Sequence, residues 1–163
     1  MNNIYFVSLL FNFAIYICLL IPPTLYCINK KIFQNKINFF VALCSATLLE
    51  IFFSLILFMN SHQIFSFFTD VQGIINTSYY ISRIVFSTSS FYALKIFTPA
   101  LLINKKKNTR LYMLFNIILS ILFMAIGFMT HNFRGFLIAI PISDIICYIL
   151  DFYIIIRTKW DTK

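Results

Sequence analysis

Five long apolar runs, separated by short polar segments, dominate the sequence. They cover about residues 4–28, 37–58, 74–103, 111–130 and 136–156. A helix needs about 20 apolar residues to cross the hydrocarbon core of a bilayer, and each run reaches that length. The third run is long enough to tilt or to protrude into water at one end. The pattern predicts an all-α fold, a polytopic membrane helix bundle with about five transmembrane helices.

The composition agrees with a bilayer environment. Hydrophobic residues make up 61% of the 163 residues and charged residues only 11%, whereas apolar residues make up roughly half of a water-soluble domain. No internal repeat, linker or soluble domain separates the apolar runs. We therefore expect one transmembrane helical domain over residues 1–163, with the lipid bilayer as its main partner.

The first apolar run is expected to be a retained helix and not a cleaved signal peptide. No basic residue precedes it, its first cation is Lys30, and no cleavage site of small residues follows it. Pro22 and Pro23 should bend its second half, because each removes a backbone donor and crowds the preceding turn. Between the second and third runs, residues 63–70 predict a short extracellular connection.

The distribution of Lys and Arg predicts the orientation, because cytoplasmic loops of membrane proteins carry an excess of both. If the N-terminus is outside, Arg134 is the one cation in the outer loops. We therefore expect a multi-pass integral protein with its N-terminus outside and its C-terminus in the cytoplasm. The cations on the cytoplasmic side are then Lys30, Lys31, Lys36, Lys105, Lys106, Lys107, Arg110, Arg157, Lys159 and Lys163.

The formal net charge of +8 does not indicate a nucleic-acid partner. Nucleic-acid-binding proteins present basic residues on a folded polar surface, and here those residues lie in short loops. The cysteines all fall in apolar runs without a CxxC spacing, which predicts buried thiols, no disulfide framework and no metal site. His62 and His131 are not placed to hold a haem, and no cofactor is expected. The cysteines are Cys18, Cys27, Cys44 and Cys147.

Ionisable side chains within the apolar runs are the first candidates for function. Each costs about 2.5–3.5 kcal/mol to insert at membrane depth, so such residues usually face protein or water. The sequence has five of them: Glu50, Arg83, Lys95, Asp144 and Asp151. We expect a ligand-binding site or polar core that consists of these residues together with Tyr80, Ser87 and Tyr148.

Helical spacing places several of these residues on stripes. Ala42, Ala46 and Glu50 repeat every four residues, so a small-residue stripe that permits close helix approach also carries the carboxylate. Glu50 should therefore point at a neighbouring helix. Spacings of three and four also give polar stripes in the third and fifth runs. These stripes are Asn76, Tyr80, Arg83, Ser87 and Ser90 in the third run, and Asp144, Tyr148 and Asp151 in the fifth.

Two clusters are predicted from the depths of these residues. Glu50, Arg83 and Asp144 fall near one level, and an Arg, which keeps its proton, needs an ionised acid partner. We expect these three to converge in the middle of the bundle. Lys95 and Asp151 share an inner layer, where they pair or Lys95 extends its ammonium to the headgroups. Two interpretations stay open: buried ion pairs that fix helix packing, and a polar cavity for a ligand, ion or proton.

No enzymatic activity and no catalytic residues are expected. The motifs GxxxxGK[ST], GxSxG and HExxH are all absent from the sequence, which removes the commonest enzyme signatures. The chain has only three glycines and no GxxxG motif, which argues against a secondary transporter.

Residues 91–99 (FYALKIFTP), followed by residues 105–107 (KKK), resemble the end of the third helix of rhodopsin-like G-protein-coupled receptors of the nematode chemoreceptor type. In that family an acidic-Arg-Tyr motif is followed at the same spacing by a proline and then by basic residues. Residues 38–40 (NFF) and the acidic Glu50 in the second run add to the likeness. The resemblance implies the first five helices of such a receptor, and a sensory or ligand-binding membrane domain without catalytic activity.

Two other classes of protein fit the same sequence. The membrane sensor modules of bacterial signalling proteins also join short helices through basic inner loops. A small accessory, immunity-type or complex-subunit membrane protein would act through helix contacts with a membrane protein partner. A small ligand bound to the purified protein would favour the receptor, whereas a stable partner from native membranes would favour the accessory protein.

Overall fold

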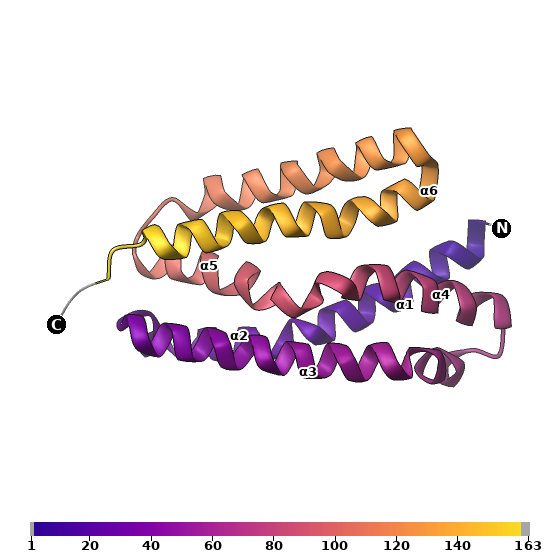
Figure 1. The fold of residues 1–163 in the computed structure, drawn as a ribbon, viewed down its shortest axis with the longest axis horizontal. Helices are drawn as coiled ribbons and strands as arrows, with labels where there is room; N and C mark the ends of the chain where they lie inside the picture. The colour runs from indigo at the N-terminus through magenta and orange to yellow at the C-terminus, as the bar shows by residue number, and fades with distance from the viewer. Residues whose placement is uncertain (1, 161–163) are drawn as a thin grey trace.

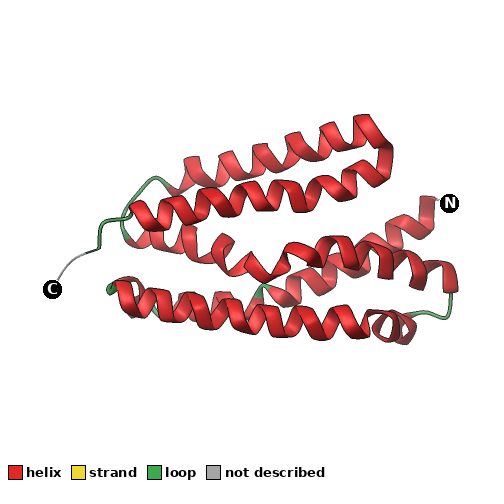
Figure 2. Cartoon of the chain, in the orientation of Figure 1, coloured by secondary structure: helices red, strands yellow, loops and turns green. Residues whose placement is uncertain are grey.

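The structure, a computed structural model, describes residues 2–160, with side chains described for residues 4–84, 87–88 and 91–160. The chain is 91% helical. Figure 2 shows helices joined by short loops, and the described residues contain no strand. The helices are α1 (Asn2–Leu19), α2 (Ile21–Ile28), α3 (Lys36–Phe68), α4 (Gln72–Val85), α5 (Tyr92–Asn104) and α6 (Thr109–Arg157), with 3-10 turns η1 (Lys30–Phe33) and η2 (Phe86–Phe91).

The first apolar run forms α1 and α2, which are separated at Leu20. Pro22 and Pro23 follow at once in the first turn of α2. Proline is tolerated there because the first amides of a helix have no intrahelical partner. The break between α1 and α2 therefore lies beside Pro22 and Pro23, where the sequence predicts a bend.

Helix α3 is longer than the second apolar run. It begins after Asn35, whose side chain accepts a hydrogen bond from the Ile37 amide at 2.9 Å, and it continues to Phe68. The prediction of a short connection over residues 63–70 is therefore wrong up to Phe68, because these residues continue α3. Packing explains the extension, because Ser61 and Phe65, one turn apart on the same face, are both buried.

The third apolar run is not one continuous helix. It divides into α4 and α5, with the 3-10 segment η2 between them. The sequence of η2, FSTSSF, explains the break, because Ser and Thr side chains compete with the helix for backbone hydrogen bonds. Ser87 Oγ, for example, donates to the Ile84 carbonyl at 2.6 Å.

Helix α6 is a hairpin of two antiparallel arms, as Figure 1 shows. Its backbone leaves the helical region at His131 and Asn132, where Asn132 has φ 55° and ψ −140°. We call residues 109–130 the first arm and residues 133–157 the second arm. The arms approach closely at Gly127 and Gly135, where a Cβ on either glycine would lie within 2.4 Å of the other's carbonyl oxygen.

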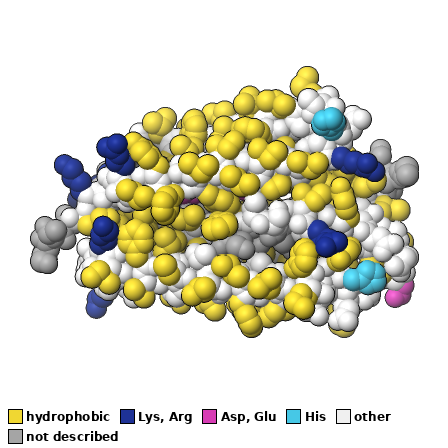
Figure 3. All heavy atoms as spheres, viewed as in Figure 1, with side chains coloured by type: hydrophobic (Ala, Val, Ile, Leu, Met, Phe, Trp, Pro, Cys, Tyr) yellow, Lys and Arg dark blue, Asp and Glu magenta, His cyan; other side chains and the backbone are white. Residues whose placement is uncertain are grey.

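The outer surface is largely apolar, and Figure 3 shows hydrophobic side chains over most of one face. Within the part of the chain that the structure describes, three helical segments are long and apolar enough to cross a membrane: Ile4–Ile28, Lys36–Phe68 and Thr109–Arg157. Monomeric soluble proteins rarely expose contiguous apolar patches of more than a few hundred Å². The structure thus supports a membrane protein.

The two ends of the bundle differ in charge. The C-terminal end of the bundle, where α6 finishes, contains the connection between α2 and α3 and the loop between α5 and α6 (Figure 1). The start of α1, the α3–α4 connection and the α6 turn lie at the opposite end. In the view of Figure 3, Lys and Arg side chains lie mainly at the C-terminal end, with others near the opposite end, where the His side chains in view also lie.

Candidate functional site

A salt bridge between Lys95 of α5 and Asp144 of the second arm lies inside the bundle. The side chain of Lys95 is 24% exposed and that of Asp144 is 6% exposed. Asp144 Oδ2 also accepts a hydrogen bond from the Thr88 hydroxyl at 3.2 Å, and the Tyr148 hydroxyl donates to the Thr88 carbonyl at 3.0 Å. The Lys95 ammonium lies 5.9 Å and 5.6 Å from the ring centroids of Tyr92 and Tyr148. One polar network therefore joins η2, α5 and the second arm.

Arg83 lies outside this network, which corrects the predicted cluster of Glu50, Arg83 and Asp144. Its side chain is exposed and its guanidinium lies over the rings of Phe58 and Tyr79, at 5.2 Å and 5.3 Å. Among the described residues, no salt bridge joins Arg83 to either carboxylate. The cation beside Asp144 is Lys95.

The polar stripe predicted on the third run faces outwards at Asn76, Tyr80, Arg83 and Ser87, whereas the side chain of Ser90 lies outside the described residues. Tyr80 is 46% exposed and lines a surface hollow near the α6 turn, and Ser87 is exposed. The inward face of α4 carries Ser78 and Ser82, which are both fully buried. Small side chains let helix backbones approach closely, so this face packs inwards and the bulky charged stripe does not.

Glu50 is fully buried and lies at the start of α5. Its Oε2 accepts a hydrogen bond from the Ala93 amide at 2.7 Å, while Oε1 has no partner among the described residues. Ala93 is the second residue of α5, so its amide has no partner within the helix. A carboxylate at this position also faces the positive end of the helix dipole. Glu50 therefore caps α5 from α3, and its stripe with Ala42 and Ala46 is buried as predicted.

Asp151 belongs to a separate layer, nearer the C-terminal end of the second arm. It is fully buried and accepts a hydrogen bond from the Tyr112 hydroxyl of the first arm. Of the two outcomes expected for Lys95, neither occurs: it bonds to Asp144, two turns before Asp151, and does not extend its ammonium to the end of the bundle. Sequence reasoning missed Tyr112, since a single hydroxyl in an apolar run carries no charge to mark it.

A cavity of about 410 Å³ opens beside the Lys95–Asp144 salt bridge. Its walls come from α1, the two arms of α6 and Lys95 of α5. We call it the ligand cavity. Apolar side chains form most of its lining, namely Phe6, Leu9, Leu10, Phe13, Met124, Phe136 and Ile140; the polar lining residues are Asn12, Tyr16, Lys95, Ser120, Ser143 and Asp144.

Asn12 is the buried polar residue on the α1 side of the ligand cavity, with 2% exposure. Its Nδ2 donates to the carbonyls of Ser8 at 2.8 Å and Ser78 at 3.2 Å, which fixes the amide orientation. Its buried Oδ1 has no hydrogen-bond partner among the described residues. Buried polar atoms normally have partners, so this oxygen marks an unsatisfied acceptor in the wall of the cavity. The four-residue spacing of Ser8 and Asn12 in the first apolar run is the sequence signal that could have marked it.

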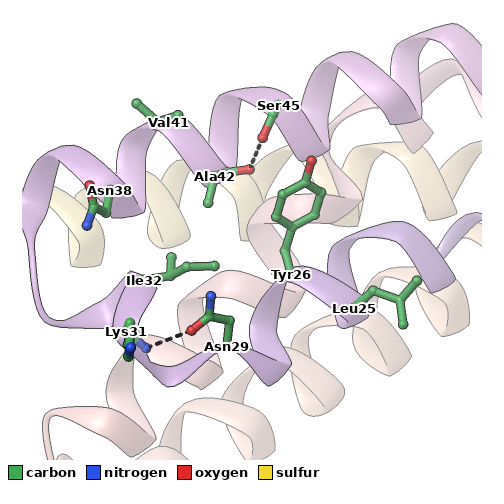
Figure 4. A pocket seen from close by; sticks show the side chains of 9 residues that line it. All are labelled: Leu25, Tyr26, Asn29, Lys31, Ile32, Asn38, Val41, Ala42 and Ser45. Atoms are coloured by element: carbon green, nitrogen blue, oxygen red, sulfur yellow. Dashed lines mark hydrogen bonds between the residues drawn. The ribbon is translucent and has the colours of Figure 1, made fainter.

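A second hollow, of about 690 Å³, lies between α2, η1 and the start of α3 (Figure 4). Asn29, Lys31 and Asn38 are its polar or charged side chains near the chain turn, and all three are exposed. Asn29 Oδ1 accepts a hydrogen bond from the Lys31 amide at 3.2 Å and so serves the local turn. Without a buried ionisable group, this hollow is a weaker candidate than the ligand cavity.

Comparison with known proteins adds no assignment. No protein-family model matches the chain, and neither a curated protein nor a solved structure is significantly similar to it. Among the described residues, no group of three His, Cys, Asp or Glu side chains could hold a metal ion. The function must therefore be inferred from the ligand cavity and the fold.

Proposed function

We propose that this chain is a five-span membrane protein, receptor-like in topology, that binds a small amphipathic molecule in the ligand cavity and has no catalytic activity. One observation carries the proposal: an apolar cavity is lined by both partners of a buried ion pair and by Asn12, whose amide oxygen has no hydrogen-bond partner among the described residues. Ligand sites are typically apolar concavities with a few polar groups that fix orientation. The resemblance of residues 91–99 to rhodopsin-like receptors is consistent with ligand binding, and a receptor-like role is itself part of this proposal.

The five proposed spans are α1 with α2, α3, the α4–η2–α5 segment, and the two arms of α6. The excess of Lys and Arg side chains at the C-terminal end in the view of Figure 3 supports an outer N-terminus and a cytoplasmic C-terminus. An odd number of spans also agrees with termini at opposite ends of the bundle.

Single cysteines at exposed positions test this topology in a variant whose four native cysteines are replaced by alanine. Gln34→Cys and Lys107→Cys should react with a membrane-impermeant maleimide only after the cells are permeabilised. Asp70→Cys, in the α3–α4 connection, should react in intact cells. Reaction of Gln34→Cys or Lys107→Cys in intact cells would reverse or break the proposed orientation.

The chemistry of the ligand follows from the cavity lining. Phe6, Leu10 and Phe13 are at least half exposed, so the α1 wall of the cavity reaches the lipid-facing surface. The Lys95 ammonium has three donors, and the Asp144 carboxylate occupies one of them. Asn12 Oδ1 needs a donor. A hydrocarbon chain with a terminal carboxyl or hydroxyl group satisfies these requirements and could enter from the bilayer.

Photo-crosslinking with a diazirine-bearing long-chain fatty acid tests this function. We expect saturable labelling of peptides from α1 or from residues 120–144, suppressed by excess unlabelled fatty acid. Leu9→Trp should reduce labelling several-fold because the larger side chain fills the cavity without removing the ion pair. Leu25→Trp, in the hollow of Figure 4, is the matched control and should not reduce it. Non-saturable labelling, or equal labelling of both variants, would contradict the proposal.

An accessory or complex-subunit role is the second candidate, and the first arm of α6 favours it. No residue of that arm is buried, so one whole face is open to lipid or to a partner helix. Purification from native membranes separates the two functions, because a stoichiometric protein partner would support the accessory role. A membrane sensor module of a signalling protein would, like the first proposal, bind a small molecule in the ligand cavity.

A further inference from the structure

A hollow of about 510 Å³ lies at the C-terminal end of the bundle, between the last turn of α5 and the start of α6. Three of its lining residues are cations, Lys106, Lys107 and Arg110, and all three are exposed. Ile103 and Met113 form its apolar wall. We call it the basic hollow. The remaining lining residues are Asn108 and Thr109.

Hydrogen bonds within the chain hold the backbone of this loop in place. The Lys107 amide donates to the Leu102 carbonyl at 2.9 Å, so the loop folds back onto the last turn of α5. At the other end of the loop, Asn108 Oδ1 accepts from the Leu111 amide at 3.3 Å and caps α6. The protein itself therefore fixes the backbone that carries the three cations.

The described acidic residues do not balance the charge of the basic hollow. Glu50, Asp144 and Asp151 are buried inside the bundle, and Asp70 belongs to the α3–α4 connection at the opposite end. The fifth acid of the sequence, Asp161, lies outside the described residues. None of the three cations forms a salt bridge with a described residue. An anionic partner therefore complements this part of the surface.

The apolar wall indicates which kind of anion fits. Met113 lies three residues after Arg110 and Ile117 four residues after Met113, so the three follow one face of the first arm. Met113 is 44% exposed and Ile117 is 56% exposed. An exposed apolar face therefore leads from the cations towards the middle of the first arm. A phospholipid has both an anionic phosphate and acyl chains, whereas a free phosphate ion leaves the apolar wall unused.

We propose that the basic hollow binds the headgroup of an anionic phospholipid, with an acyl chain along the first arm of α6. Lys and Arg form charge-assisted hydrogen bonds with phosphate oxygens. Basic clusters next to membrane spans attract the anionic lipids of the cytoplasmic leaflet, and the proposed topology places this end of the bundle on that side. The site goes beyond the proposed ligand-binding function, because none of its residues lines the ligand cavity.

Native mass spectrometry of the purified, detergent-solubilised protein tests the site. Phosphatidylglycerol and phosphatidylcholine with the same acyl chains are added in equal amounts, and we expect several-fold more bound phosphatidylglycerol. A triple variant with Lys106→Gln, Lys107→Gln and Arg110→Gln should lose this preference and keep its phosphatidylcholine adducts. Inorganic phosphate should not displace the lipid; displacement would assign the hollow to a soluble phosphate and overturn the proposal.

A second triple variant, with Lys30→Gln, Lys31→Gln and Lys36→Gln, is the matched control. It removes the same number of positive charges from the same end of the bundle but no residue of the basic hollow. Its preference for phosphatidylglycerol should match that of the parent. Equal losses in the two triple variants would overturn the proposal, because binding would then follow net charge alone. A parent protein without the preference would overturn it as well.

The helical circular dichroism signal shows whether each variant is folded. If the triple variant of the basic hollow does not fold, Arg110→Gln alone provides the second test. It should lose part of the preference for phosphatidylglycerol, because one of the three cations is removed. An unchanged preference in folded Arg110→Gln would then contradict the site.

Discussion

Lys95→Met is expected to lower the free energy of unfolding by about 3–5 kcal/mol, because it leaves the Asp144 carboxylate buried without its cation. Asp144 is 4% exposed, and its other partner in the described structure is a neutral hydroxyl, that of Thr88. Methionine keeps most of the length and apolar stem of lysine, so the loss of charge dominates. Thermal or denaturant unfolding of the purified protein measures the change.

A double variant separates the ion pair from simple packing. Lys95→Met combined with Asp144→Asn should recover much of the lost stability, since a buried ion pair contributes little compared with a neutral, well-packed pair. Arg83→Leu is the control, and we expect a change within about 0.5 kcal/mol because Arg83 is exposed. A larger loss for Arg83→Leu than for Lys95→Met would mean that the central cation has been misassigned.

The all-helical fold is predictable from the sequence, because runs of about 20 apolar residues allow few other structures in a bilayer. The hairpin of α6 is predictable for the same reason: two such runs meet at a polar segment that contains His131 and Asn132. Apolar runs are less informative about helix ends. Helix α3 extends to Phe68 because Ser61 and Phe65 pack inside the protein, and long-range packing of this kind is not encoded in a local window.

The candidate site is predictable in part. Glu50, Lys95, Asp144 and Asp151 stood out as ionisable residues at membrane depth, and the structure places all four inside the bundle. Arg83 did not follow, because the inward face of α4 carries the small residues Ser78 and Ser82, and a polar stripe alone does not indicate which face of a helix packs inwards. The 3-10 segment η2, which follows Arg83, was also missed, since local hydrogen bonds of Ser and Thr are too subtle to locate such a break from residue spacing.

Neutral polar residues were the main omission. Asn12, Thr88 and Tyr112 each contact a group of the buried network or the ligand cavity, yet in sequence they are isolated polar positions in apolar surroundings. Their importance depends on which helices become neighbours, which a single sequence does not specify. Lys95 and Thr98, three residues apart on α5, illustrate the result: one face of that helix contributes Lys95 to the ligand cavity and Thr98 to the surroundings of Asp151.

The close contact between the arms of α6 depends on two glycines. A Cβ on Gly135 would lie 2.0 Å from the carbonyl oxygen of Gly127, and a Cβ on Gly127 would lie 2.4 Å from that of Gly135. Both obstacles are backbone atoms, so no change of side-chain rotamer relieves them. Gly73 differs, because the nearest atom to its added Cβ is Ile4 Cδ1 at 3.5 Å, an ordinary contact with a side chain.

Gly135→Ala is therefore expected to lower the free energy of unfolding by about 3 kcal/mol, at the upper end of overpacking costs, because the arms must separate along the hairpin. Gly127→Ala should have a similar effect, and the double variant should lose less than the sum, since one separation relieves both clashes. Gly73→Ala, the matched control, should change stability by less than about 1 kcal/mol and in the stabilising direction, because alanine favours the helix. Unfolding midpoints of the four proteins measure these differences. If Gly135→Ala and Gly73→Ala unfold at the same midpoint, the two arms do not meet at these glycines.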